Sequence, residues 1–306
     1  MPRWLIYSPL LALLALLLPR IDLRQSSMTA HPPADHGEQV GPAPSSSSAS
    51  SHGAKPTLLM DQVVMFGDSI TQGAWIPGGT GARLADAWQR KLDVINRGFS
   101  GYNTVMGLEV LRQFLPRSTE PVPKMAIFIV WFGANDAAVS PSPQSMTLEE
   151  FKANLRTILD LVRSPSSPHH SPHTQLVLLT PPPVDDAVRA ADLGARVPAR
   201  TPDREAARTE AFAKAVQEVG AEEGPDGRKV PVVDVWGRIM QKARDEEGGK
   251  LGRFLRDGLH LTPDGYQCVT AGISELLYGE YPHLYWENME QVFPHWTHYI
   301  PPEKRF

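Results

Sequence analysis

The chain has 306 residues, which is long enough for one large domain or two small ones. Its hydrophobic content of 42% and charged content of 21% are ordinary for a globular protein, and a formal net charge of −4 gives no reason to expect nucleic acid as a partner. A single cysteine, Cys268, excludes an intramolecular disulfide, and the spacing of cysteine and histidines resembles no zinc site.

Residues 4–18 form an almost uninterrupted apolar run near the start of the chain. The run is short for a bilayer span and fits the hydrophobic region of a secretory signal better. No small-x-small cleavage site follows it, so a signal anchor and an overextended gene model, with Met28 or Met60 as the true start, stay open as alternatives. The location of the protein therefore stays undecided between secretion, anchoring and a cytoplasmic catalytic domain.

Residues 32–55 contain many serines and prolines and lack apolar anchors, which is typical of a disordered linker. No internal repeat divides the rest of the chain. We therefore expect two parts: an N-terminal hydrophobic segment with its linker over residues 1–56, and one folded domain over residues 57–306.

From about Leu58 onward, strand-like and helix-like segments alternate, which is the pattern of a doubly wound α/β domain. Five short apolar runs are predicted to be strands: Val63–Phe66, Val94–Asn96, Met125–Trp131, Leu176–Leu179 and Val230–Val235. Helices are predicted from Leu148 to Val162, from near Pro202, and from Thr262. We expect a three-layer α/β/α sandwich around a mainly parallel, five-stranded central sheet.

The first predicted strand runs directly into Gly67-Asp68-Ser69. Its apolar residues do not alternate with polar ones, which favours a strand covered on both faces, as in a parallel sheet. A serine where such a strand stops would place its hydroxyl at the carboxyl edge of the sheet, where open α/β folds bind ligands. By itself, the Gly-Asp-Ser sequence could equally be an ordinary turn.

Polar or glycine-rich segments also follow the second and third strands, at Gly98–Asn103 and Gly133–Asp136. In a parallel sheet these segments would lie with Ser69 at one edge. A hydroxyl nucleophile and N–H donors are the groups that acyl transfer needs, and Ser69, the glycine N–H groups and the Asn135 amide could supply them. A fourth segment, Asp257-Gly258-Leu259-His260, has the spacing for a carboxylate to hold one imidazole nitrogen while the other faces the serine. Each segment alone could be a turn or a surface pair, and their joint occurrence in chain order favours a catalytic site.

These four segments resemble the signature blocks of the SGNH (GDSL-type) hydrolase superfamily and, within it, the isoamyl acetate-hydrolysing esterase family. The resemblance covers roughly residues 61–299. It implies a flavodoxin-like fold in which Ser69 is the nucleophile, His260 is the general acid/base, and Asp257 orients His260.

The resemblance further implies an oxyanion hole formed by the N–H groups of Ser69 and Gly101 and by the Asn135 side chain, with no metal ion or organic cofactor. The implied substrates are water and a short-chain ester of a small alcohol, with acetate esters favoured. A lysophospholipase, thioesterase or carbohydrate acetylesterase of the same superfamily, an acyltransferase, and a non-catalytic ester- or glycan-binding module are the alternatives. Neither nucleic acid nor a stable membrane partner is expected for the catalytic domain, and the oligomeric state is not predicted.

Residues 185–204 follow the fourth predicted strand on the side of the site and are rich in alanine and arginine. Segments in this position often cover an active site and shape its pocket. The sequence favours neither a lid over the acyl or alcohol pocket nor a plain surface excursion.

Overall fold

The computed structural model of the chain describes residues 60–304. The predicted hydrophobic segment and linker of residues 1–56 lie outside the described residues. Among the residues described, no helix combines the length and the apolar character needed to cross a membrane.

One sheet of five strands forms the centre of the domain, in the order β2-β1-β3-β4-β5, and every neighbouring pair is parallel. The strands are β1 (Gln62–Gly67), β2 (Asp93–Gly98), β3 (Met125–Trp131), β4 (Gln175–Leu179) and β5 (Val232–Val233). The predicted parallel sheet is confirmed. The last strand is shorter than expected because the Asp234 side chain accepts a hydrogen bond from the Gly237 N–H and starts a helix there.

The direction in which the chain builds the sheet reverses at β1. From β1 the chain goes to β2 on one side, and it then crosses to β3 on the other side of β1. In doubly wound sheets, ligands bind outside the carboxyl ends of the strands at such a reversal. The topology therefore places the ends of β1 and β3, with their Ser69 and Asn135 loops, at the expected binding position.

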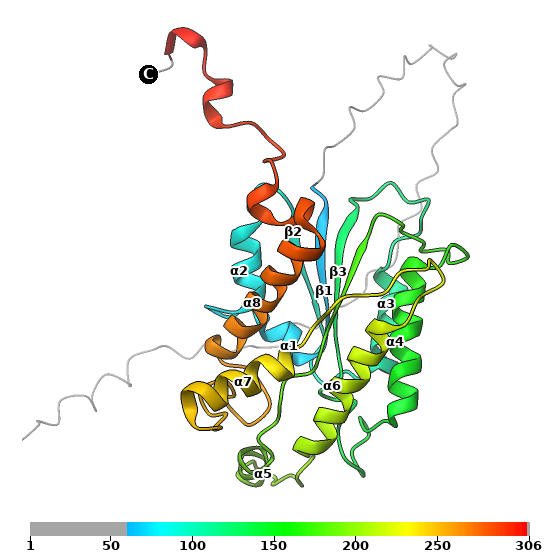
Figure 1. Cartoon of the computed structure of the whole chain (residues 1–306), viewed down its shortest axis with the longest axis vertical. Helices are drawn as coiled ribbons and strands as arrows, with labels where there is room; N and C mark the ends of the chain where they lie inside the picture. Colours follow the sequence, from blue (N-terminus) through cyan, green and yellow to red (C-terminus); the bar gives the residue numbers. More distant parts are fainter. Residues whose placement is uncertain (1–59, 305–306) are drawn as a thin grey trace, which may run out of the picture. The chain divides into compact units, whose positions relative to one another are not determined.

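Helices cover both faces of the sheet (Figure 1), with α2, α7 and α8 on one side and α3, α4 and α6 on the other. The helices are α1 (Ser69–Gln72), α2 (Thr80–Ala87), α3 (Thr104–Phe114), α4 (Leu148–Arg163), α5 (Asp186–Gly194), α6 (Ala206–Ala221), α7 (Val235–Glu247) and α8 (Pro263–Glu280). Short 3₁₀ turns occur at Gly73–Trp75, Pro282–Leu284, Trp286–Asn288, Trp296–Tyr299 and Pro302–Lys304. The predicted three-layer α/β/α architecture is confirmed.

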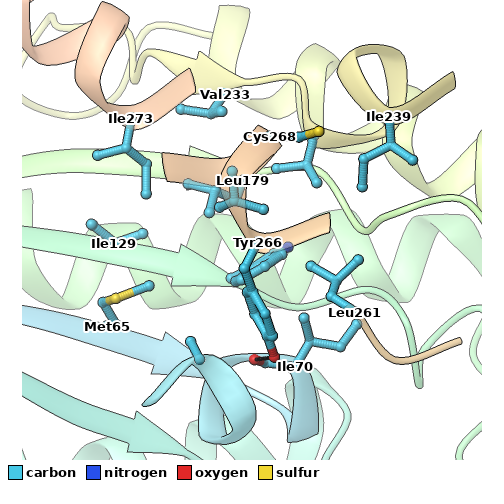
Figure 2. Close-up of a cluster of buried hydrophobic side chains, with 14 of the residues drawn as sticks. Met65, Ile70, Ile129, Leu179, Val233, Ile239, Leu261, Tyr266, Cys268 and Ile273 are labelled. Atoms are coloured by element: carbon cyan, nitrogen blue, oxygen red, sulfur yellow. Dashed lines mark hydrogen bonds between the residues drawn. The ribbon is translucent and has the colours of Figure 1, made fainter. Parts of the chain in front are cut away.

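Alternate residues of each strand enter two separate hydrophobic cores. Met65 of β1 and Ile129 of β3 face α8, where they meet Ile273 in the core drawn in Figure 2. Phe66 and Phe128, one residue along from these, belong to the opposite core with α3, α4 and α6. Side chains of a strand alternate between its two faces, so an apolar run without alternation is what a sheet covered on both sides requires.

Local sequence signals explain where two of the long helices begin. Thr147 and Glu150 form a capping box at the start of α4, and Thr262 accepts a hydrogen bond from Gly265 at the start of α8, as predicted. The start of α6 differs from the prediction, because it begins at Ala206 and not near Pro202. Residues 202–205 form neither helix nor strand, and two of them, Asp203 and Arg204, make buried hydrogen bonds to other parts of the domain.

Candidate active site

Ser69 is the first residue of α1 and follows the end of β1 after a single residue. That residue, Asp68, caps the helix by accepting a hydrogen bond from the Ile70 N–H at 2.8 Å. The turn lies tight against β3, because a Cβ atom on Gly67 would come within 2.2 Å of the Trp131 carbonyl oxygen. The turn therefore requires glycine at position 67 and holds the half-buried serine at the carboxyl edge of the sheet.

Ser69 Oγ lies 2.9 Å from His260 Nε2, and His260 Nδ1 lies 2.7 Å from Asp257 Oδ2. The second carboxylate oxygen of Asp257 accepts hydrogen bonds from the backbone N–H groups of His260 at 2.8 Å and Leu259 at 3.2 Å. The structure thus brings the three predicted residues into one hydrogen-bonded series, although 191 positions separate the serine from the histidine.

The segment that carries Asp257 and His260 is held at both ends. Leu255 and Leu261 form an antiparallel bridge across its base, and the Gly258 carbonyl accepts a hydrogen bond from the Asp185 N–H at 2.9 Å. These contacts fix the loop by its backbone and leave both functional side chains directed to their partners.

Tyr266, one turn into α8, ties this helix to the serine turn. Its hydroxyl donates a hydrogen bond to the Ile70 carbonyl at 2.7 Å (Figure 2). Burial raises the pKa of the Tyr266 hydroxyl above its ordinary value, so the group stays protonated and keeps this bond. The elements that carry Ser69 and His260 are therefore joined by a second contact behind the site.

Asp257 is an ionised carboxylate in this setting. Partial burial by itself would raise the pKa of the Asp257 carboxyl, but hydrogen bonds from the His260 side chain and from the backbone N–H groups of His260 and Leu259 outweigh it. The pKa of Asp257 is therefore held well below its ordinary range. An ionised carboxylate only accepts hydrogen bonds, so it selects the tautomer of His260 with hydrogen on Nδ1 and leaves Nε2 free to accept from Ser69.

The predicted oxyanion donors Gly101 and Asn135 lie in the loops after β2 and β3, and these loops contact each other. Gly101 has a φ of 82°, which favours glycine, and its carbonyl accepts a hydrogen bond from Gln144 at 2.6 Å. The Asn135 side chain donates from Nδ2 to the Tyr102 carbonyl at 2.9 Å and accepts at Oδ1 from Arg204 at 2.8 Å. Asn135 thus contacts the residue next to Gly101.

The loop after β2 also contacts the serine turn. The Phe99 N–H donates to the Gly67 carbonyl at 2.9 Å, and the Ser100 N–H donates to the Gln72 side chain at 2.8 Å. The loops after β1, β2 and β3 are therefore joined by hydrogen bonds into one rim at the carboxyl edge of the sheet.

Two buried carboxyl groups lie behind this rim. Burial raises the pKa of Asp68 to about 7 and the pKa of Asp136 to about 6, and the charge of Asp136 adds to the increase at Asp68. Asp136 Oδ1 accepts two hydrogen bonds from Thr104, from its N–H at 2.8 Å and from its hydroxyl at 2.6 Å. Asp136 Oδ2 has no hydrogen-bond partner among residues 60–304, so ionisation of this carboxyl costs free energy in the folded state.

Replacing Asp136 with asparagine is expected to change the pH dependence of stability. Because the folded state raises the pKa of Asp136, the contribution of this carboxyl to stability is lost as the pH rises from about 4, where an aspartate in the unfolded chain ionises, to about 6. Asparagine stays neutral and keeps an acceptor for Thr104, so the variant should gain stability relative to wild type across this interval. Urea unfolding at several pH values measures the difference.

An Asp93→Asn variant provides the matched control, because Asp93 is exposed at the start of β2. The free energy of unfolding of this variant should follow the wild-type protein at every pH. A difference between Asp136→Asn and wild type that stays constant between pH 4 and pH 7 would contradict the assignment of a raised pKa to Asp136.

The structure adds three buried charged residues that the sequence reasoning did not single out. Arg189, Asp203 and Arg204 are only 5%, 8% and 4% exposed, and all three lie in the segment expected to be a lid or a surface excursion. The segment is visibly rich in arginine, but no periodicity in its sequence distinguishes the buried arginines from the exposed Arg196. Only their contacts with the site identify them.

Two of the three histidines between α4 and β4 lie within hydrogen-bond distance of other protein groups. His169 Nδ1 lies 3.0 Å from the Pro116 carbonyl, and His173 Nε2 lies 3.1 Å from the Ser171 hydroxyl. Within the described part of the chain, no group of three or more His, Cys, Asp or Glu side chains is arranged to hold a metal ion.

A serine at the switch point of a five-stranded parallel sheet, hydrogen-bonded to a histidine, is the arrangement of a hydrolase that uses a hydroxyl nucleophile. Residues 65–268 match the GDSL-like lipase/acylhydrolase family. The chain belongs to this family and is a carboxylic ester hydrolase, which confirms the resemblance drawn from the four sequence segments.

The similar proteins include esterases that this chain covers over more than nine tenths of their length. The isoamyl acetate-hydrolyzing esterase 1 homolog of Bos taurus is 34% identical over 247 residues, which cover 78% of this chain and 91% of that protein. The human homolog is 31% identical over 252 residues, covering 79% and 93%. A GDSL esterase/lipase of Arabidopsis thaliana is 34% identical over 246 residues, covering 78% and 94%.

Solved structures share the fold. The lipase/acylhydrolase of Enterococcus faecalis superposes with a TM-score of 0.51 at 26% identity, covering 77% of this chain and 100% of that chain. The acetyl xylan esterase AlAXEase superposes with a TM-score of 0.53, covering 71% and 99%. At 15% identity, the second likeness shows the fold alone.

Proposed function

We propose that the chain hydrolyses short-chain carboxylic esters of small alcohols, above all acetate esters, through an acyl-enzyme intermediate on Ser69. The observation that carries this proposal is the hydrogen-bonded series of Ser69, His260 and Asp257, with distances of 2.9 Å and 2.7 Å. These contacts are the ones that activate a serine hydroxyl in hydrolases with a Ser-His-Asp triad. The catalytic domain proposed here spans residues 57–306.

In the first step, Ser69 Oγ attacks the carbonyl carbon of the ester while His260 Nε2 accepts the hydroxyl proton. The ionised Asp257 stabilises the imidazolium that forms. His260 then gives its proton to the departing alkoxide, so that the alcohol leaves and the acyl group stays on Ser69.

In the second step, a water molecule replaces the alcohol. His260 Nε2 accepts a proton from this water as its oxygen attacks the acyl carbon, and the bond to Ser69 Oγ breaks as the proton passes to that oxygen. The carboxylic acid is released and the serine hydroxyl is restored. The two steps use the ester, water and groups of this chain.

In both steps the carbonyl oxygen becomes negatively charged. We assign the N–H groups of Ser69 and Gly101 and the Asn135 amide as the donors that stabilise it. Donors held in place before the reaction contribute more than donors that must be oriented during it, because no reorganisation is needed as the charge develops. The hydrogen bonds that join the three strand-end loops support this assignment.

The preference for acetate rests on the names of the esterases to which the chain is similar. A series of p-nitrophenyl esters from acetate through butyrate and octanoate to palmitate tests it, with isoamyl acetate assayed by release of acetic acid. We expect kcat/KM to be highest for acetate and to fall with chain length. A maximum at octanoate or palmitate would contradict the proposal and favour a lysophospholipase.

The remaining alternatives give different results with the same purified protein. A fluorophosphonate probe labels only an activated serine, so a binding module without catalysis would leave Ser69 unlabelled. A carbohydrate acetylesterase or a thioesterase would prefer acetylated oligosaccharides or acyl thioesters over isoamyl acetate. An acyltransferase would form a new ester when a second alcohol is added.

A further inference from the structure

A network of buried charged side chains lies directly behind the site. It consists of Arg189 on α5 and of Asp203 and Arg204 in the segment between α5 and α6. Asp203 accepts hydrogen bonds from the Arg189 guanidinium at 3.1 Å and 3.3 Å and lies 3.2 Å from Arg204 Nη1. Buried charges are costly unless paired, and both arginines pair with the Asp203 carboxylate.

The network reaches both parts of the site. Arg189 Nη1 lies 3.4 Å from Asp257 Oδ2, the carboxylate oxygen that also faces His260. Arg204 contacts the loop after β3, where Nε donates to the Ala134 carbonyl and Nη2 donates to Asn135 Oδ1, both at 2.8 Å. The Arg204 fork therefore binds two successive residues of the loop that carries the proposed oxyanion donor.

The contact with Arg204 determines which way the Asn135 amide faces. An asparagine side chain has one acceptor oxygen and an NH₂ group with two donors. Arg204 occupies the oxygen, and the Tyr102 carbonyl accepts one of the two N–H groups at 2.9 Å. A rotated amide would set its NH₂ group against the guanidinium donors and its oxygen against the Tyr102 carbonyl, so only one orientation is compatible with these partners.

The second N–H of Asn135 has no hydrogen-bond partner among residues 60–304. It is therefore the group available to a substrate oxygen. The positive charge of Arg204 also polarises the amide, which makes this N–H a stronger donor. Both effects act on the reaction through Asn135, because Arg204 itself is buried and bonded to Ala134, Asn135 and Asp203.

We propose that Arg204 is a positioning residue that holds the Asn135 amide in the orientation in which it stabilises the oxyanion. The inference rests on the role of Asn135 given under the proposed function. In this role, the segment between α5 and α6 supports the oxyanion hole through Arg204. A competing explanation is that Arg204 only stabilises the fold through its pairing with Asp203.

Kinetics of Arg204 variants separate these explanations. Arg204→Met removes all donors of the fork, and it should lower kcat by about 10- to 100-fold while KM changes less than about threefold, because a misplaced oxyanion donor affects the transition state more than the bound ester. Arg204→Lys keeps the charge and one point of contact, so it should recover part of this loss. Arg112→Met is the matched control, because Arg112 is exposed on α3 and pairs with Glu109 on the same helix, and it should retain wild-type kcat.

A double-mutant cycle with Asn135→Ala gives the decisive measurement. Asn135→Ala alone is expected to lower kcat by about 10²- to 10³-fold. If Arg204 acts through Asn135, adding Arg204→Met to this variant should cost no more than about threefold further. Circular dichroism and thermal melting establish that each variant is folded, and the same cycle with Arg204→Lys replaces the methionine variant if that variant does not fold.

The outcomes point to different conclusions. A loss from the Arg204 variant that is as large in the Asn135→Ala background as in wild type would overturn the inference and assign Arg204 to fold stability. Unchanged kcat in a folded Arg204→Met protein would overturn it as well. Wild-type kcat in Asn135→Ala alone would instead overturn the oxyanion role of Asn135 under the proposed function, and the inference with it.

Discussion

A Ser69→Ala variant is expected to have a kcat for ester hydrolysis that is lower by a factor on the order of 10⁶, as in other serine hydrolases that lose their nucleophile. The Ser69 hydroxyl lies 2.9 Å from His260 Nε2, and no acyl-enzyme can form without it. Hydrolysis of p-nitrophenyl acetate and labelling by a fluorophosphonate probe measure the loss in two independent ways.

The same substitution at Ser100 provides the control for Ser69→Ala. Ser100 is exposed in the loop after β2, and its hydrogen bond to Gln72 comes from the backbone, so Ser100→Ala should keep its activity. Both variants should melt close to the wild-type temperature. A folded Ser69→Ala protein that still hydrolyses the ester at more than a small fraction of the wild-type rate would end the esterase mechanism proposed on Ser69.

Asp257→Asn is expected to reduce kcat by roughly 10⁴-fold while the fold is retained. The ionised carboxylate can only accept the hydrogen bond from His260 Nδ1, whereas an amide can also donate to it. When the amide donates to Nδ1, the imidazole carries its hydrogen on Nε2 and can no longer take the proton of Ser69. Steady-state kinetics with an acetate ester measure this loss.

Asp264→Asn is the matched control, since Asp264 lies in the first turn of α8 and pairs with Arg253 at the surface. Because the folded state lowers the pKa of Asp257, its ionised form contributes stability above the ordinary pKa of an aspartate, and this contribution is lost as the pH falls through the lowered value. The melting temperature of Asp257→Asn should therefore be measured together with its kcat, so that a loss of stability is distinguished from a loss of catalysis. A loss of less than about tenfold in a folded variant would show that Asp257 does not orient His260.

Most of the architecture could be predicted because its signals are local. Strands covered on both faces read as apolar runs, and Thr147 with Glu150 marks a helix start through contacts only three residues apart. Prediction was weaker at two boundaries. Val235 reads as the end of a strand but begins α7, because the Asp234 side chain caps a helix there. The helix expected near Pro202 starts later, at Ala206, because Arg204 makes distant contacts with Ala134 and Asn135.

The sequence by itself determined which chemical groups stand at the ends of the strands, because a parallel sheet brings all its carboxyl ends to one edge. Ser69 and Asn135 could therefore be placed at one site. The Asp257–His260 pair lies between α7 and α8 and was joined to them by its spacing and by the family resemblance. The tertiary structure alone decided how these groups are supported, since Arg204 meets Asn135 across 69 positions and Arg189 meets Asp257 across 68. The sequence does not distinguish a buried arginine from an exposed one. Only the packing shows which guanidinium is desolvated and therefore needs hydrogen-bonded partners.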